Sequence, residues 1–160
     1  VAKTRYVLHV TDKMFSSFIA GQVLEGFILG TLCTLGMMAF RFPDALSIGA
    51  LVGVSALIPM IGAWIGGVVG FVLIAVVSPI QAILFVVFII VLQQVEGNLI
   101  YPRVVGGTIG LPGLLVLAAI TIGSGLAGII GMMLAVPITA TLYRLMRNAT
   151  FKKEGIQVKE

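Results

Sequence analysis

The chain has 160 residues, of which 59% are hydrophobic and only 10% are charged, and its formal net charge is +4. A soluble domain carries about 25% charged residues, so this chain has too little polar surface to cover a water-facing globule. Nucleic-acid binding would need a basic stripe with interleaved aromatic residues, and the sequence contains no such stripe. The composition therefore predicts an all-α polytopic membrane protein whose main partner is the lipid bilayer.

Residues 14–40 are the first predicted transmembrane helix, and residues 1–13 are expected to be the end of a preceding segment. A bilayer core needs about 20 apolar residues, and this stretch is uncharged except for Glu25. Pro43 ends the helix, because proline disfavours helix at its own position and at the residue before it. Gly26 and Gly30 form a GxxxG step, which permits close packing between helices in lipid.

Residues 45–77 form a long uncharged stretch. As one helix it would be about 50 Å long, which is too long for one perpendicular crossing and short for two. Pro59, Gly62, Gly66 and Gly67 interrupt its middle. The pattern predicts a re-entrant hairpin of two half-helices that enters and leaves the membrane on the same side.

Residues 80–101 are the next predicted span, and glycines at 106, 107 and 110 provide a flexible connection after it. A second uncharged stretch follows over residues 112–143, with an expected kink at Pro137. Its middle is interrupted by a group of small residues, which predicts a second hairpin: Gly123, Ser124, Gly125, Gly128 and Gly131.

The two halves resemble each other. The run Gln22-Val-Leu-Glu25-Gly26 recurs as Gln93-Gln-Val-Glu96-Gly97, and each run precedes a stretch interrupted by glycine. We therefore predict two tandem repeats, over 14–79 and 80–146, each a transmembrane helix followed by a re-entrant hairpin, and a cytoplasmic tail over 147–160. A helix plus a re-entrant hairpin makes one net crossing, so tandem copies are inverted relative to each other, as in many secondary transporters.

The positive charges test this topology. With both ends in the cytoplasm, nine of the ten Lys and Arg residues lie inside and only Arg41 lies outside. If each long stretch crossed once instead, Arg103 would also lie outside. The charge count therefore favours the hairpins only slightly.

Glu25 and Glu96 are the candidates for coupling to an ion or a proton. A carboxylate at membrane depth is costly and is a functional-site hypothesis by default. Gln22 and Gln93 precede them by three residues, on the same helix face, so each amide can donate to the carboxylate. Burial favours the protonated acid and a bound cation favours the carboxylate, so such a group can exchange one for the other. The alternative is that each glutamate only links neighbouring helices.

Broken helices expose unpaired backbone groups, which are tolerated at membrane depth only inside protein or beside a cavity. The hairpin tips are therefore predicted to line the substrate pathway, although the same small residues also suit tight packing. Asn98, Tyr101 and Arg103 flank the second span, either as interfacial anchors or as gate or substrate contacts, and Asn98 and Arg103 are the candidate gate residues. The tip residues are Ser55, Pro59, Gly62, Ser124, Gly125, Gly128 and Gly131.

Enzymatic chemistry is not predicted. The chain has one histidine and one cysteine, both isolated, and Cys33 is expected to be a small buried hydrophobe. The sequence contains no metal-ligand cluster and no P-loop. We therefore expect no catalytic residue, no metal and no cofactor.

Three runs together resemble the AI-2E family of transporters: Ile58-Pro59-Met-Ile-Gly62, Gln93-Gln-Val-Glu96-Gly97-Asn98 with Pro102 behind it, and Gly128-Ile-Ile-Gly131 leading to Val136-Pro137. The resemblance covers about residues 15–147, the C-terminal half of a member. It implies a multi-pass bacterial inner-membrane protein that self-associates. It also implies export of autoinducer-2 for some members and exchange of sodium for protons for others.

The sequence thus predicts a secondary transporter for a small solute, or for a monovalent cation or proton, that works as a homo-oligomer. Two alternatives remain open at this stage. A passive oligomeric channel would conduct without proton coupling. A membrane scaffold would give neither current nor flux and would tolerate loss of Glu25 and Glu96.

Overall fold

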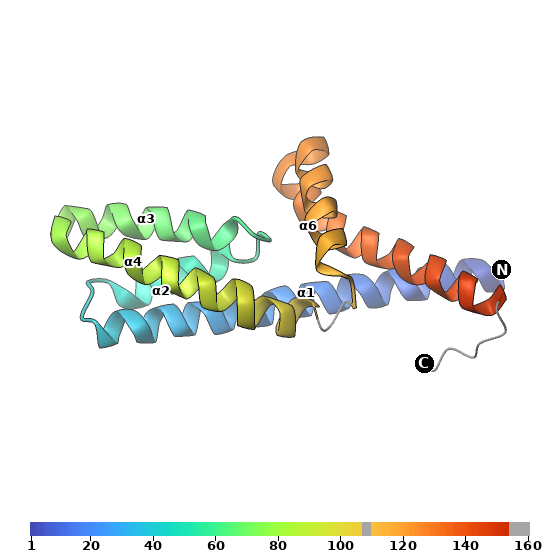
Figure 1. Ribbon diagram of the computed structural model, residues 1–160, viewed down its shortest axis with the longest axis horizontal. Coiled ribbons are helices and arrows are strands. Elements are labelled where there is room, and N and C mark those ends of the chain that lie inside the picture. The colour runs from blue at the N-terminus through green and yellow to red at the C-terminus, as the bar shows by residue number, and fades with distance from the viewer. Residues whose placement is uncertain (107–109, 154–160) are drawn as a thin grey trace. The chain divides into compact units, whose positions relative to one another are not determined.

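The computed structural model describes residues 1–106 and 110–153, and this part of the chain is helical without a strand (Figure 1). Among the described residues, three helical stretches are long and apolar enough to cross a membrane, namely Ala2–Ala39, Pro79–Gly106 and Gly113–Phe151. These stretches fit the predicted polytopic membrane protein. The elements in chain order are α1 (Ala2–Ala39), α2 (Ala45–Ser55), α3 (Gly62–Val77), α4 (Pro79–Val95), the π-helical turns η1 (Glu96–Ile100) and η2 (Pro102–Gly106), and α6 (Gly113–Lys153).

The chain divides into two compact units. One unit is Ala20–Val105, and the other combines Val1–Ile19 with the chain from Gly106 onward. These units are defined by which residues contact one another, whereas the repeats were predicted from similar sequence runs, so the division into units does not test the repeats. The repeat boundaries at residues 79 and 146 therefore stay a prediction.

Helix α1 begins at Ala2, well before the predicted start at Met14, because the chain contains no glycine or proline before Gly21. It ends in a Schellman motif, in which Arg41 has a positive φ of 57°. The amide of Phe42 donates to the carbonyl of Met37 at 2.9 Å, and the amide of Arg41 donates to that of Met38 at 3.2 Å. The predicted stop before Pro43 is confirmed.

The stretch 45–77 forms two short helices, α2 and α3, with a break over residues 56–61. Their 11 and 16 residues correspond to about 17 and 24 Å, less than a bilayer core. Pro59 is buried inside the break and Met60 has a φ of 66°, so the predicted interruption at Pro59 is correct. Gly66 and Gly67 were wrongly expected to break the chain. They lie inside α3, where they leave room for the side chains of its neighbours.

The second predicted interruption falls inside α6. The helical path is broken at Ala127 (φ −144°) and Gly128 (φ 59°), where the chain turns back on itself. The predicted tip residues Ser124 and Gly125 are instead helical, because the reversal needs a positive φ and the chain adopts it at Gly128. Pro137 lies inside the second part of α6, where the backbone angles stay helical, and the kink expected there remains a prediction.

Close contact between α1 and α2 depends on glycine. A Cβ at Gly26 would lie 2.6 Å from the carbonyl oxygen of Gly53, and one at Gly30 would lie 3.1 Å from the Cα of Gly53. The predicted packing role of Gly26 and Gly30 is confirmed, and its partner is a second GxxxG step, Gly49 and Gly53, on α2. The two backbones can approach this closely because no side chain separates them.

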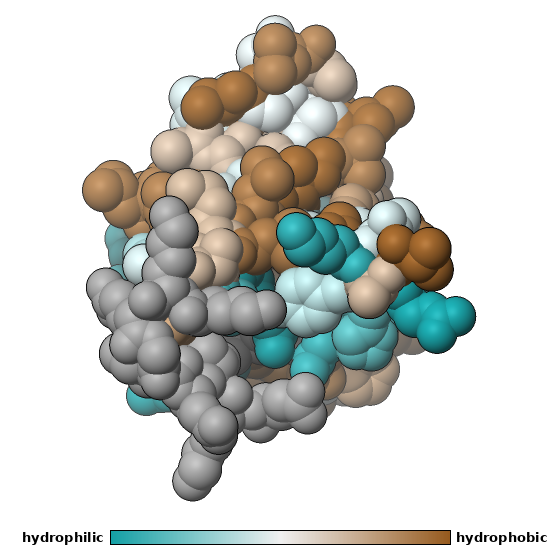
Figure 2. All heavy atoms as spheres, turned by 90° about the vertical axis from the view of Figure 1, so that its right-hand side faces the viewer, coloured by the Kyte–Doolittle hydropathy of each residue, from teal (hydrophilic) through white to brown (hydrophobic). Residues whose placement is uncertain are grey.

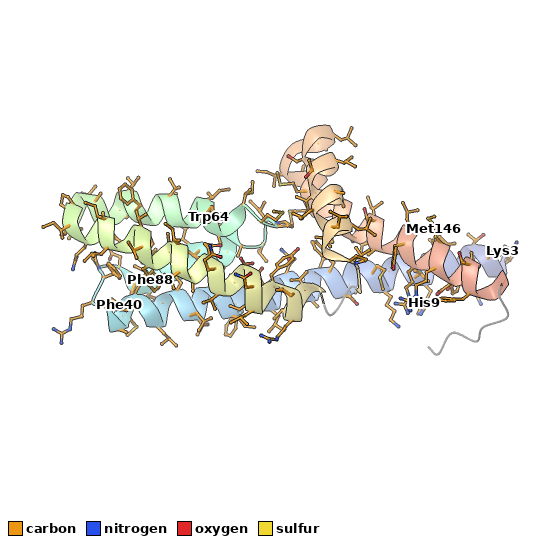
Figure 3. All side chains as sticks on the ribbon, in the orientation of Figure 1. Lys3, His9, Phe40, Trp64, Phe88 and Met146 are labelled. Atoms are coloured by element: carbon orange, nitrogen blue, oxygen red, sulfur yellow. The ribbon has the colours of Figure 1, made fainter. Side chains whose placement is uncertain are left out.

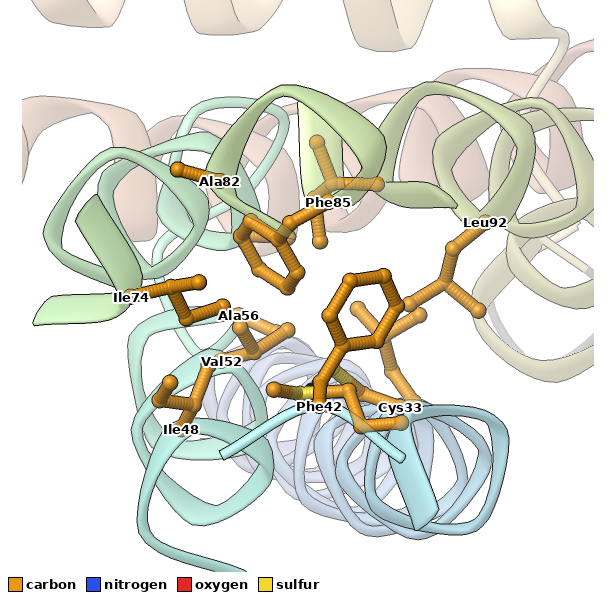
Figure 4. Packing of buried hydrophobic residues seen from close by; sticks show 13 residues of the cluster. Cys33, Phe42, Ile48, Val52, Ala56, Ile74, Ala82, Phe85 and Leu92 are labelled. Atoms are coloured by element: carbon orange, nitrogen blue, oxygen red, sulfur yellow. Dashed lines mark hydrogen bonds between the residues drawn. The ribbon is translucent and has the colours of Figure 1, made fainter. Parts of the chain in front are cut away.

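The core of the unit Ala20–Val105 lies where α1 to α4 face one another (Figure 4). Cys33 is fully buried there, as predicted, beside Met37 of its own helix. Phe42 and Phe85 pack edge to face with ring centroids 5.8 Å apart. Trp64, on the first turn of α3, is by contrast 45% exposed (Figure 3). The core thus fixes the four helices around the break at 56–61.

In the other unit, the amide of Asn148 on α6 donates to the hydroxyl of Tyr6 on α1 at 2.5 Å. Figure 3 places Lys3 and His9 on this first part of α1 and Met146 on the last part of α6. Hydrophilic side chains gather on part of the face shown in Figure 2, and hydrophobic side chains cover much of the rest. Exposed Lys3, Arg5 and Arg147 are among the cations of this unit.

Candidate functional site

Polar side chains meet inside the unit Ala20–Val105, at the level of the break between α2 and α3. Gln22 and Glu25 are each only 3% exposed on α1. Gln93, near the end of α4, is 8% exposed, and Glu96 follows at the start of η1. Side chains of this kind are rarely buried unless they are paired, so this cluster is the candidate site.

Gln22 connects α1 to the break. Its amide nitrogen donates to the carbonyl oxygens of Ala56 and Leu57, each at 3.3 Å. These carbonyls lie just beyond the last turn of α2, where helical partners run out. The expected hydrogen bond from Gln22 to Glu25 is therefore absent, because the freed carbonyls take the amide protons instead.

Glu25 on α1 and Glu96 on η1 face each other, with their carboxyl groups within hydrogen-bonding reach. An ionised carboxylate only accepts hydrogen bonds, so a hydrogen bond between two carboxyl groups requires at least one proton on the pair. The repeated sequence motif thus places two acids from distant parts of the chain beside each other, with Glu25 buried and Glu96 half-buried.

The span that carries Glu96 was predicted to end at Tyr101. It instead continues through Pro102 to Gly106 as π-helix. The Tyr101 hydroxyl is buried and interacts electrostatically with both glutamates. The sequence predicted Tyr101 to be an interfacial anchor or a gate or substrate contact, and did not place it beside the glutamates. Its spacing of five residues after Glu96, directly before a proline, is the signal that was available.

Several polar atoms of the cluster have no hydrogen-bond partner within the protein. Buried polar groups are nearly always paired, so the cluster has unused capacity for water, an ion or a polar solute. The unpartnered atoms are two acceptors, Gln22 Oε1 and Glu25 Oε2, and two groups that can donate, Gln93 Nε2 and the Tyr101 hydroxyl.

The remaining predicted site residues lie outside this cluster or at its edge. Ser55, at the end of α2, donates to the carbonyl of Val52 at 3.1 Å. Gly62 begins α3, and a Cβ there would overlap the carbonyl of Ser55. Asn98 is exposed and donates to the backbone and side chain of Gln94, at 2.8 and 3.2 Å. Arg103 is exposed on η2.

The second hairpin belongs to the other compact unit. Gly123 and Gly131 lie so close to each other there that a Cβ on either would overlap the carbonyl of the other. Open space surrounds Gly125 and Gly128. Over residues 1–106 and 110–153, no three His, Cys, Asp or Glu side chains gather in a way that could hold a metal ion.

Comparison with known proteins places these features in a family. The sequence pattern of the family described as AI-2E family transporter matches residues 2–151. The chain is 37% identical over 140 residues to "Putative transport protein YrrI" of Bacillus subtilis, covering 87% of this chain and 39% of the relative. It is 28% identical over 133 residues to "Putative transport protein YueF" of the same organism, covering 83% of this chain and 36% of the relative.

Another relative is "Putative transport protein YhhT" of Escherichia coli, which is 28% identical over 134 residues, 83% of this chain and 38% of the relative. The chain thus spans less than two fifths of the length of each of these curated relatives. No solved structure matches it.

Proposed function

This chain belongs to the AI-2E family of transporters, and we propose that it forms the part of a secondary transporter in which the Glu25–Glu96 pair exchanges the coupled proton or cation. The observation that carries the proposal is the close approach of two carboxyl groups from different helices, of which Glu25 is buried and Glu96 half-buried. A carboxyl group that must gain and lose charge inside a membrane needs a second polar group beside it, because a lone charge at the centre of a membrane helix costs about 2.5–3.5 kcal/mol on insertion scales.

The contacts of Gln22 support a link between the carboxyl pair and the break at 56–61. Gln22 and Glu25 lie on one face of α1, and the amide of Gln22 is bonded to the break. When the pair loses its proton, a cation or a polar solute that approaches Glu25 also meets the unpartnered Gln22 Oε1. Binding of a proton or cation by the carboxyl pair and the position of the break are then coupled, because Glu25 and Gln22 lie on one face of α1.

The transported species is a small polar solute such as autoinducer-2, or sodium exchanged for protons. We further propose that the two helix–break–helix segments are re-entrant hairpins of inverted repeats, that both ends of the chain face the cytoplasm, and that the protein works as a homo-oligomer in a bacterial inner membrane. The short lengths of α2 and α3 support the re-entrant arrangement, since neither helix reaches across a bilayer core.

The test is flux through the full-length native protein in proteoliposomes, with sodium or autoinducer-2 as the solute, with and without a pH gradient. Glu25→Gln and Glu96→Gln keep the shape and the hydrogen bonding of the site but cannot change charge. Each is expected to lower pH-driven flux at least about tenfold, and the double variant is expected to abolish it. Asp12→Asn removes an exposed carboxylate outside the cluster and should leave flux unchanged.

Wild-type flux and wild-type pH dependence in the double variant would show that the carboxyl pair is structural. Flux that continues in the wild type without any response to the pH gradient would instead identify a passive channel. Absence of both flux and current, with either solute, would identify a scaffold.

A further inference from the structure

Tyr101 follows Glu96 by five residues, a spacing that an α-helix cannot place on one face. Five residues of α-helix turn the chain through 500°, which leaves the two side chains about 140° apart. In η1 the amide of Tyr101 instead donates to the carbonyl of Glu96, five residues back. This wider turn moves Tyr101 towards the face that carries Glu96.

Pro102 explains why the wider turn forms here. Proline has no amide proton, and its ring clashes with the carbonyl four residues earlier in a regular helix, here that of Asn98. The side chain of Asn98 also donates to the carbonyl of Gln94, a group that would otherwise serve the α-helical ladder alone. Both features favour the change from α-helix to π-helix between Glu96 and Gly106.

The Tyr101 hydroxyl is buried and has no hydrogen-bond partner, and it interacts with both acids of the cluster. Glu25 on α1 and Glu96 on η1 are the titratable groups that act on it in the described part of the chain. One oxygen of Glu25 is also without a partner. A donor and an acceptor thus lie in the same site, and neither has a hydrogen-bond partner.

We propose that Tyr101 is a positioning residue for proton exchange, whose hydroxyl donates to the carboxyl pair when the shared proton leaves. This inference rests on the proposed function of the pair. The released proton goes to water, the tyrosine keeps its own, and its hydroxyl replaces the lost hydrogen bond. The π-helical turn is the device that brings this donor to Glu25 and Glu96.

Tyr101→Phe removes the donor and keeps the ring. A hydrogen bond to an ionised group favours the ionised form, so its loss makes proton release harder. The pH midpoint of carboxyl titration, followed by infrared absorption of the protonated acid in the reconstituted full-length protein, should rise by about one pH unit. The pH midpoint of flux should rise with it, while maximal flux is retained.

Tyr143→Phe is the matched control, because Tyr143 lies on α6 in the other unit and should leave both midpoints unchanged. In a Glu25→Gln/Glu96→Gln background, Tyr101→Phe should change nothing further. Pro102→Ala restores the amide proton and should raise the midpoint as Tyr101→Phe does, by letting the tyrosine turn away from the pair.

An unchanged infrared midpoint in Tyr101→Phe would overturn the role of the hydroxyl, whatever the flux shows. The infrared midpoint needs no transport, so the two proposals can fail separately. If it moves as expected while wild-type flux ignores the pH gradient, Tyr101 still tunes the pair and only the proposed coupling to transport is refuted.

Discussion

Gly26→Ala is expected to weaken the contact between α1 and α2. The added Cβ would lie 2.6 Å from the carbonyl oxygen of Gly53, closer than real Cβ atoms approach such a group. That oxygen belongs to the backbone of α2, so it can move away only if the two helices separate. Overpacking of a close contact costs about 1–3 kcal/mol.

Gly36→Ala is a matched control in the same helix. Its new Cβ would also lie 2.6 Å from its nearest neighbour, but that neighbour is the ring edge of Phe88, a side chain that can rotate. Both changes gain the same helix propensity, about 0.8–1.0 kcal/mol, which cancels in the comparison. Gly26→Ala should therefore be less stable than Gly36→Ala by about 1–3 kcal/mol.

The assay is unfolding of the detergent-solubilised protein, followed by loss of helical circular dichroism. Equal stability of the two variants, within about 0.5 kcal/mol, would refute the reasoning that a backbone neighbour differs from a side-chain neighbour. A Gly26→Ala/Gly53→Ala double variant should lose less than the sum of the single losses, because the first change has already separated the helices.

Two further predictions concern the second hairpin and the topology. Gly131→Leu should lower transport more than it lowers membrane insertion, because the new Cβ would overlap the carbonyl of Gly123. Gly125→Leu is the control, since open space surrounds Gly125. Equal transport by the two variants would contradict this prediction. Cysteine introduced at Arg41 should react with an impermeant maleimide from outside the cell and cysteine at Arg103 only from inside, and labelling of position 103 from outside would exclude the hairpin topology.

Local sequence determined much of the helical organisation. Long uncharged stretches predicted the spans, because a segment that crosses lipid must pair all its backbone polar groups within itself, as a helix does. Pro43 and Pro59 marked true interruptions, because proline removes a donor and clashes with the preceding turn. The glycines were ambiguous: Gly128 adopts the positive φ of a reversal, whereas Gly66 lies in a regular helix where it leaves room for a neighbour. Composition alone does not separate these two uses of glycine.

The candidate site required the tertiary structure. The sequence singled out Glu25 and Glu96 by their repeated motif, but their close approach depends on how α1 packs against α4 and η1. The Gln22 amide was expected to donate to Glu25. It donates instead to the backbone carbonyls of the break after α2. Tyr101 was undervalued because helical periodicity places it on another face from Glu96. Only the change to π-helix before Pro102, a response of the backbone to a missing donor, brings its hydroxyl to the acids.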